Sequence, residues 1–110
     1  MSDCIFCKIV SKEMETTLIY EDSKIIAFDD ISPVAPEHIL VIPRKHYDTI
    51  EDVGDSDIFS HLFSKIPEIA NKKGLKDYRI VVNKGEEAGQ TVFHLHIHII
   101  GGRVLQWPPG

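Results

Sequence analysis

The chain has 110 residues, 43% of them hydrophobic and 26% charged, with a formal net charge of −5 at pH 7. This length predicts a single domain over residues 1–110, and an acidic chain without a Lys- and Arg-rich stretch is not expected to bind nucleic acid. No apolar run approaches the roughly 20 residues that cross a bilayer, and Met1 to Cys4 do not resemble a signal peptide, so we expect no membrane partner and a cytoplasmic location.

The first half of the chain predicts a short helix followed by three strands. We expect the helix from Ile5 to Ser11, with Asp3 near its start as a cap. Runs of apolar, β-prone residues predict strands at 17–20, 25–28 and 38–42. The segment 29–37 carries two prolines and is expected to be a loop.

The second half predicts one long amphipathic helix and two further strands. Apolar residues recur every three or four positions over 56–73, at Ile58, Phe59, Leu62, Phe63, Ile66, Ile69 and Ala70. Asp55 or Ser56 is expected to cap this helix, Gly74 to end it, and Pro67 to kink or restart it. His61 is interpreted as a structural or surface residue. With strands at 79–83 and 93–100, the pattern predicts an α+β fold with a mainly antiparallel sheet.

Three alternating histidines are the strongest chemical signal in the sequence. Residues 94–98 read His-Leu-His-Ile-His, and alternation along a strand places the imidazoles on one face over roughly 13 Å. Leu95, Ile97 and Ile99 then point into a core. Three adjacent imidazolium ions would repel one another, so at least one ring is expected to be neutral. A neutral imidazole can be a nucleophile, a general base or a metal ligand, which predicts a chemical site.

The segment 84–91 leads directly to these histidines and contains two glycines. Glycine permits turns that direct backbone N–H groups at an anion, and Gln90 and Thr91 add side-chain donors. By itself this is an ordinary connection between strands. Beside three histidines, it is interpreted as a phosphate-binding loop.

Almost the whole chain resembles one family. The motif His-x-His-x-His with two following apolar residues occurs together with the segments 27–33, 35–38, 41–46, 82–83, 101–103 and the Trp-Pro-Pro-Gly end. With these flanks the chain resembles the Hint branch of the histidine-triad (HIT) superfamily, which comprises purine nucleoside phosphoramidases and nucleotidyl hydrolases. The resemblance implies a five-stranded HIT fold with one short and one long helix, joined in a homodimer.

The resemblance also implies a covalent mechanism. His96 would attack the α-phosphorus of a purine nucleoside 5′-phosphoramidate, and water would then release AMP or GMP from the nucleotidyl-histidine. His98 would stabilise charge on the phosphate oxygens, and His38 would support the histidine row. The remaining phosphate or leaving-group positions are Asn83, Gly89, Gln90, Thr91 and Val92. Thr91 stands where relatives often carry serine, so its hydroxyl is retained.

The nucleoside is expected to occupy a pocket with one carboxylate and apolar walls. Asp30 matches the acidic residue that accepts both ribose hydroxyls, which suits an ionised carboxylate because it only accepts hydrogen bonds. Without the resemblance, Asp30 would be interpreted as a turn residue. The apolar walls match Ile5, Phe6, Ile9, Phe28 and Ile31, which would otherwise be core residues.

A Cys-x-x-Cys pair, Cys4 and Cys7, is compatible with a zinc site, a reduced thiol pair or a redox pair. Some bacterial relatives carry this pair and bind a structural zinc, which implies His46 and His94 as the other two ligands. Other Hint proteins lack the cysteines, so catalysis is not expected to require the metal.

Two other functions remain as alternatives. Strand histidines can hold a catalytic zinc that activates water, which would make the protein a zinc-dependent hydrolase. The same pocket could also serve a nucleotide sensor or scaffold with little turnover. In either case the family implies a homodimer in which the C-terminal tail, with Trp107, lies near the partner's site.

Overall fold

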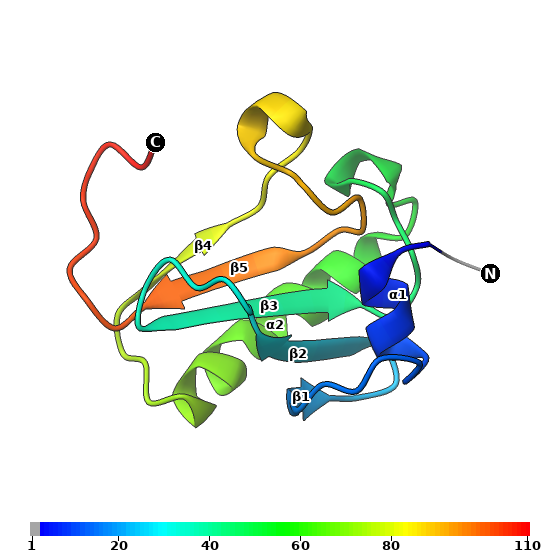
Figure 1. Ribbon diagram of the computed structural model, residues 1–110, viewed down its shortest axis with the longest axis horizontal. Helices are drawn as coiled ribbons and strands as arrows, with labels where there is room; N and C mark the ends of the chain where they lie inside the picture. The colour runs from blue at the N-terminus through cyan, green and yellow to red at the C-terminus, as the bar shows by residue number, and fades with distance from the viewer. Residues whose placement is uncertain (1–2) are drawn as a thin grey trace.

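The computed structural model describes residues 3–110 as one five-stranded sheet with helices on both faces (Figure 1). The strands are β1 (Leu18–Glu21), β2 (Ile25–Asp29), β3 (Glu37–Pro43), β4 (Tyr78–Val81) and β5 (Ile97–Gly101). Their order is β1-β2-β3-β5-β4, and every neighbouring pair is antiparallel. The predicted α+β fold with an antiparallel sheet is confirmed.

The two α-helices differ greatly in length. The helix α1 (Ile5–Val10) lies against the front face of the sheet in Figure 1, and α2 (Ser56–Lys72) covers the back. Two single-turn 3₁₀ helices, η1 (Ile50–Asp52) and η2 (Glu86–Ala88), lie in the connections. No helix within residues 3–110 combines the length and apolarity needed to span a bilayer.

Strand alternation gives the sheet two apolar faces. On β3, Ile39 and Val41 face α2, whereas Leu40 and Ile42 face α1. The α2 side holds the larger core, which includes Leu95, Ile97 and Ile99 as the sequence predicts. The α1 side holds a smaller core, and the histidines occupy another part of the same face.

The helix α2 follows its predicted pattern with two exceptions. Asp55 caps its start by accepting the Asp57 N–H, and Gly74 follows its end with φ of +73°. Pro67 does not restart the helix. It lies on the exposed face, where water can hydrogen-bond to the carbonyl group that lacks a donor because proline has no N–H. Phe63, expected on the apolar face, is 44% exposed.

The predicted strand 93–100 is wrong at its start, because β5 begins at Ile97. The Leu95 N–H donates to the Tyr47 carbonyl at 2.6 Å, so the residues before Ile97 bond to the chain that follows β3. The predicted cap of α1 is also wrong. Cys4, not Asp3, occupies the cap position, and its Sγ accepts the Cys7 N–H at 3.4 Å.

Candidate active site and metal cluster

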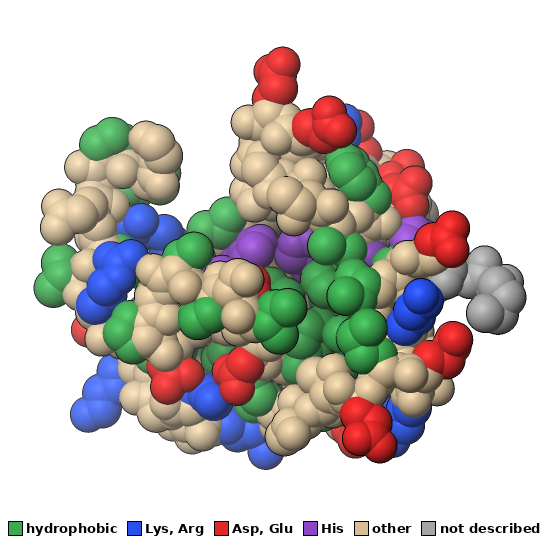
Figure 2. Space-filling view, in the orientation of Figure 1, with side chains coloured by type: hydrophobic (Ala, Val, Ile, Leu, Met, Phe, Trp, Pro, Cys, Tyr) green, Lys and Arg blue, Asp and Glu red, His purple; other side chains and the backbone are tan. Residues whose placement is uncertain are grey.

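The histidines gather at the bottom of a hollow bordered by hydrophobic side chains (Figure 2). The pairing of β3 with β5 sets Leu40 opposite His98 and His38 opposite Ile100, so the two histidines lie diagonally on one face. His96, just before β5, extends the row, with its ring centroid 4.9 Å from that of His98. The structure thus brings His38, His96 and His98 together, as predicted.

His96 has one ring nitrogen fixed as a donor. Its Nδ1 lies 2.7 Å from the backbone carbonyl oxygen of His94, and a carbonyl can only accept, so Nδ1 carries the proton. Burial lowers the pKa of His96 and favours the neutral ring. A neutral imidazole protonated at Nδ1 keeps a lone pair on Nε2, which is the form a nucleophile needs.

The protons of His38 and His98 follow from a similar argument. The Val34 N–H donates to Nδ1 of His38 at 3.1 Å, so His38 carries its proton on Nε2. That Nε2 lies 2.8 Å from Nδ1 of His98 and donates to it. Burial, followed by the neighbouring His96 and His38, lowers the pKa of His98 to about 4. His98 is therefore neutral, with its proton on Nε2.

The Nε2–H of His98 is buried and has no hydrogen-bond partner within the described chain. A buried unmet donor costs about 1–3 kcal/mol, so it marks a place where an acceptor is expected to bind. The row therefore sets the lone pair of His96 beside a donor that can take a phosphate oxygen.

Asp30 lies next to this row, immediately after β2. Its Oδ1 accepts the Ser32 N–H at 2.8 Å, and its Oδ2 is 3.4 Å from Nε2 of His38. The structure thus places the predicted ribose-binding carboxylate at the edge of the histidine site.

The loop that contains η2 stands at the top of Figure 1, and the histidine side chains lie below it in the same view of Figure 2. Gly85 and Gly89 adopt φ of +96° and +101°, which favours glycine at both positions. Gly89 faces the side-chain amide of Asn83, with Thr91 exposed and Val92 half-buried beyond it. These predicted contact residues therefore lie along one segment.

Gln90 differs from its predicted role as a phosphate donor. Its side chain is buried, and its amide donates to the carbonyls of Asp48 and Val92 and accepts the Gly85 N–H. A phosphate contact from Gln90 would have to replace one of these bonds. In this structure Gln90 holds the loop in shape.

The residues predicted to line the base pocket differ in burial. Phe6, Ile9 and Phe28 pack together in the core beside α1, and the Phe6 ring meets the His96 ring edge-to-face at 5.2 Å. Ile5 is 38% exposed. Ile31 is 94% exposed, so its side chain is not packed in the core and is accessible to a ligand.

Four other side chains form a second cluster beside the row: Cys4, Cys7, His46 and His94. Nδ1 of His94 lies 3.3 Å from Sγ of Cys4, 3.5 Å from Sγ of Cys7 and 3.2 Å from Nδ1 of His46. A tetrahedral zinc has ligand atoms about 3.3–3.8 Å apart, given its bond lengths. The four side chains are therefore spaced to hold a metal ion.

Both imidazoles in this cluster present a lone pair to its centre. Nε2 of His94 donates to the Pro43 carbonyl at 2.8 Å, and Nε2 of His46 to the Asp48 carboxylate at 2.6 Å. Burial is the main reason that the pKa of His94 falls to about 4, so its ring is neutral. A metal ion between these two Nδ1 lone pairs and the two sulfur atoms would be bound by all four groups, which supports metal binding.

A second group of potential ligands does not present a lone pair from every imidazole to its centre. It consists of Asp30, His38 and His98. His38 carries its proton on the inward-facing Nε2, because Nδ1 already accepts the Val34 N–H. It therefore offers no lone pair to a metal. The donor chemistry therefore distinguishes the four-residue cluster, which could hold a metal ion, from the histidine row.

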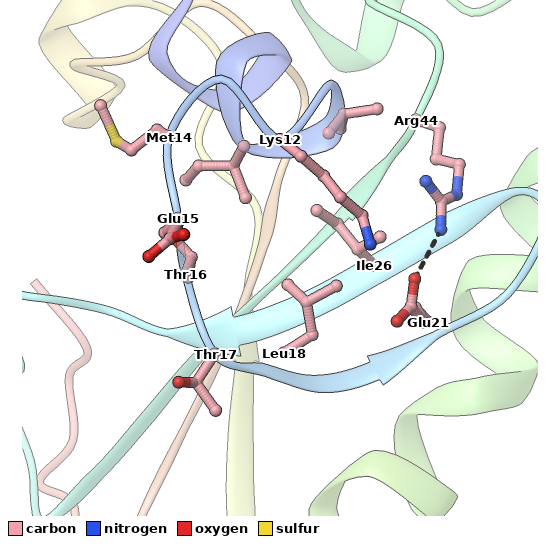
Figure 3. Close-up of a pocket in the computed structure, with 11 residues that line it drawn as sticks. Lys12, Met14, Glu15, Thr16, Thr17, Leu18, Glu21, Ile26 and Arg44 are labelled. Atoms are coloured by element: carbon pink, nitrogen blue, oxygen red, sulfur yellow. Dashed lines mark hydrogen bonds and ion pairs between the residues drawn. The ribbon is translucent and has the colours of Figure 1, made fainter.

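A hollow of about 660 Å³ lies beside the end of α1 and includes none of the histidines (Figure 3). Its apolar floor contains Ile9, Leu18 and Ile26, and the Arg44–Glu21 ion pair closes one side at 3.1 Å. It lacks a nucleophile beside an unmet donor, so the histidine row remains the candidate site.

Comparisons with known proteins identify the family. The HIT domain family matches residues 11–105 of this chain. The chain belongs to the HIT family. An uncharacterized HIT-like protein of Rickettsia prowazekii (strain Madrid E) is 49% identical over 106 residues, covering 92% of this chain and 88% of the relative.

Solved HIT structures agree with this fold. A HIT family hydrolase from Legionella pneumophila Philadelphia 1 superposes with a TM-score of 0.93 at 44% identity, covering 98% of this chain and 100% of that one. A histidine triad protein from Clostridium difficile has a TM-score of 0.90 at 47% identity, covering 96% of each chain. Both likenesses extend over the histidine row.

The sequence did not predict three groups that hydrogen-bond to the histidines of this HIT site. The Val34 N–H, the Pro43 carbonyl and the Asp48 carboxylate each fix the proton of one histidine. Two of these groups belong to the backbone, so no residue type signals them. Asp48 is two residues from His46, which was the one available signal.

Proposed function

We propose that this protein hydrolyses purine nucleoside 5′-phosphoramidates through a covalent intermediate on His96. The observation that carries the proposal is the lone pair on Nε2 of His96 beside the unmet Nε2–H of His98. The lone pair of His96 suits attack on phosphorus, and the N–H of His98 suits the charge that develops on a phosphoryl oxygen. The Legionella pneumophila relative is named a HIT family hydrolase, which supports a hydrolytic reaction.

The reaction has two displacements. Nε2 of His96 forms a bond to the α-phosphorus, the P–N bond breaks, and the departing amine takes up a proton. Water then attacks the phosphorus, the P–Nε2 bond breaks, and the nucleoside monophosphate leaves. The Nδ1–H bond to the His94 carbonyl stabilises the positive charge on His96 while the intermediate exists.

The substrate is proposed to span the hollow from Asp30 to the loop above the row. Asp30 would accept the ribose hydroxyls, and the buried Phe28 and Phe6 would face the base. Thr91, exposed beside the loop, would contact the phosphate or the leaving group. Adenine and guanine both suit these apolar walls.

We propose zinc as the ion of the four-residue cluster. Two thiolates and two neutral imidazoles match a structural Cys₂His₂ site, in which all four positions are filled by protein. Such an ion leaves no open position for a reacting water, so the cluster favours a structural role over a zinc-dependent hydrolase.

We further propose a homodimer joined at β4. This strand is last in the sheet order and pairs only with β5 in the described chain, and Ile80 on it is 40% exposed. An exposed edge strand is a template for pairing with a second chain. The tail passes β4, where Arg79 donates to the Gln106 carbonyl, so a partner at this edge would meet Trp107.

The proposal is tested by mass spectrometry of protein quenched during turnover of an adenosine 5′-phosphoramidate, with His96→Ala alongside. We expect an adenylyl group on His96 in the original protein and none in the variant. Product release without an adduct would contradict the proposal and favour direct attack by metal-bound water. Nucleotide binding with neither adduct nor product would favour the sensor.

A further inference from the structure

His94 belongs to both centres of the molecule. Its ring Nδ1 faces the metal cluster, and its ring Nε2–H donates to the Pro43 carbonyl. Its backbone carbonyl accepts the Nδ1–H of His96. The residue that completes the metal cluster is therefore the one that fixes the proton of the nucleophile.

The helix α1 makes a second connection between the two centres. Cys4 caps the helix and Cys7 lies in it, so two ligands of the cluster hold its first turn. Phe6 lies between them, and its ring packs edge-to-face on His94 at 5.9 Å and on His96 at 5.2 Å. A shift of α1 would therefore move a ring that rests on the nucleophile.

Neither segment is held by the hydrogen-bond ladder of the sheet. The helix α1 has six residues, too few to be stable by itself. His94 and His96 precede β5 and are outside its ladder. In metal-free protein Nδ1 of His94 and Nδ1 of His46 accept only weak hydrogen bonds from the Cys4 and Cys7 thiols, each at 3.3 Å, so the two rings are held less firmly than by one shared ion.

We propose that metal occupancy of the Cys4, Cys7, His46 and His94 cluster sets the rate at which His96 attacks phosphorus, with His94 as the positioning residue. The inference rests on the proposed function, because it concerns the attack step of that reaction. Asp30 and Phe28 lie on or beside β2, away from the cluster, whereas Phe6, the other proposed base contact, lies in α1 between two of its ligands. Metal loss therefore slows adduct formation by a larger factor than it weakens nucleotide binding.

The test compares His46→Gln with the matched control His61→Gln. His46 is an exposed ligand of the cluster, whereas His61 pairs with Asp22 away from both centres. Each protein, and the original protein stripped by chelator and reloaded with zinc, is measured for bound zinc, for AMP affinity by calorimetry, and for the single-turnover rate of His96 adduct formation. In ¹⁵N-labelled protein, exchange of the His96 Nδ1–H reports its bond to His94.

We expect roughly 10- to 100-fold slower adduct formation in His46→Gln and in stripped protein, the loss that misplacement of a reacting group by about 1 Å produces. AMP affinity falls by a smaller factor than the adduct rate, the His96 Nδ1–H exchanges faster, and zinc restores the stripped protein but not His46→Gln. His61→Gln retains zinc and the original rate.

Equal adduct rates with and without bound zinc would overturn the inference and leave the proposed function intact. A fall in AMP affinity equal to the fall in rate would also overturn it, because the cluster would then merely support the fold. Absence of an adduct in the zinc-loaded original protein would overturn the proposed function, and the inference with it.

Discussion

In three of the buried histidines, one ring nitrogen has a backbone partner whose hydrogen-bonding role is fixed. His38 receives an amide N–H, His96 donates to a carbonyl, and His94 donates to another carbonyl. An amide can only donate and a carbonyl can only accept, so the backbone alone decides where each proton lies. The tautomers of these three histidines are therefore a property of the fold.

The role of Asp30 is tested by Asp30→Asn. The amide retains an oxygen for the Ser32 N–H but places an NH₂ group where the carboxylate would accept a ribose hydroxyl. A hydrogen bond to a charged group contributes about 1.5–3 kcal/mol, so we expect AMP to bind roughly 10- to 100-fold more weakly by calorimetry. The control ligand is 2′,3′-dideoxy-AMP, which should bind both proteins alike. Equal AMP affinity in the two proteins would contradict the assignment.

Residue identities in the site could be predicted, but their detailed roles could not. The alternation of residues 94–98 was enough to place the imidazoles on one face. Which nitrogen carries each proton depends on Val34 and Pro43, and these contacts form only when distant segments pack. Gln90 shows the same limit, since its type indicates a donor but not that both of its amide hydrogens are already used.

At the scale of elements, α1 depends on its attachment to the sheet. The helix has six residues, with Phe6 and Ile9 buried and two cysteines in the second cluster. Because so short a helix is unstable alone, its folding free energy comes from packing and from the ligands it contributes.

Metal removal is therefore expected to destabilise the fold. A ligand at 100 times its Kd contributes about 2.7 kcal/mol, which lowers Tm on the order of 10 °C when it is lost from a domain of this size. We expect this shift on addition of chelator in differential scanning calorimetry, and a Cys7→Ser variant with low Tm that no longer responds. Chelator already saturated with zinc is the control. If free chelator does not change the Tm of the original protein, the prediction of a structural metal is wrong.

A separate polar cluster joins α2 to the β1–β2 hairpin. Asp22 Oδ2 accepts the Tyr20 hydroxyl at 2.8 Å and the His61 Nε2–H at 2.7 Å, which confirms His61 as a structural residue. The bond to Asp22 is the main reason that the pKa of Tyr20 rises to about 12. Burial would raise the pKa of Asp22, but four hydrogen bonds outweigh it and hold that pKa well below its ordinary value.

This cluster predicts a pH dependence of stability. A carboxyl whose pKa is lower in the folded state stabilises the fold above its unfolded pKa, about 3.9, and loses that contribution as pH falls toward the folded value. We therefore expect Asp22→Asn to flatten the decline in the free energy of unfolding below about pH 4, measured with urea. Asp77→Asn, at an exposed position, should decline like the original protein. The same slope in Asp22→Asn as in the original protein would contradict the prediction.

The sequence pattern predicted those elements whose ends are set by residues within or next to the element itself. The helix α2 has its apolar stripe and both of its caps in the sequence, so its bounds were almost fully predictable. The start of β5 was not, because a ladder ends where its partner strands end. The strand β4 stops at Val81, and the residues before Ile97 bond instead to the segment after β3.

At the scale of the molecule, the C-terminal tail is a separate surface feature. Val104 and Trp107 are 81% and 79% exposed, and contacts of Arg79 with Gln106 and Trp107 fix the path of the tail. An apolar segment that is ordered but exposed is typical of an interaction surface. This agrees with the proposed homodimer.

Deletion of residues 105–110 is expected to change substrate preference more than stability. The tail buries little surface in the chain itself, so Tm should change by only a few degrees. The ratio of kcat/KM values across phosphoramidates with small and bulky amines should change, because the tail would shape the leaving-group side of the partner's site. Removal of residues 108–110 alone, which keeps Trp107, is the matched control. Unchanged ratios after the longer deletion would contradict the role of the tail.

The neutral histidine row has a consequence for product release. No lysine or arginine hydrogen-bonds to His38, His96 or His98 within residues 3–110, and Asp30 lies beside the row. The substrate carries one negative charge at phosphorus, whereas a monophosphate approaches two at pH 7. AMP inhibition should therefore weaken as pH rises through about 6, and stronger inhibition at pH 8 would contradict this. A site without formal positive charge would repel the dianion that the proposed reaction produces, so product release would be favoured over product inhibition.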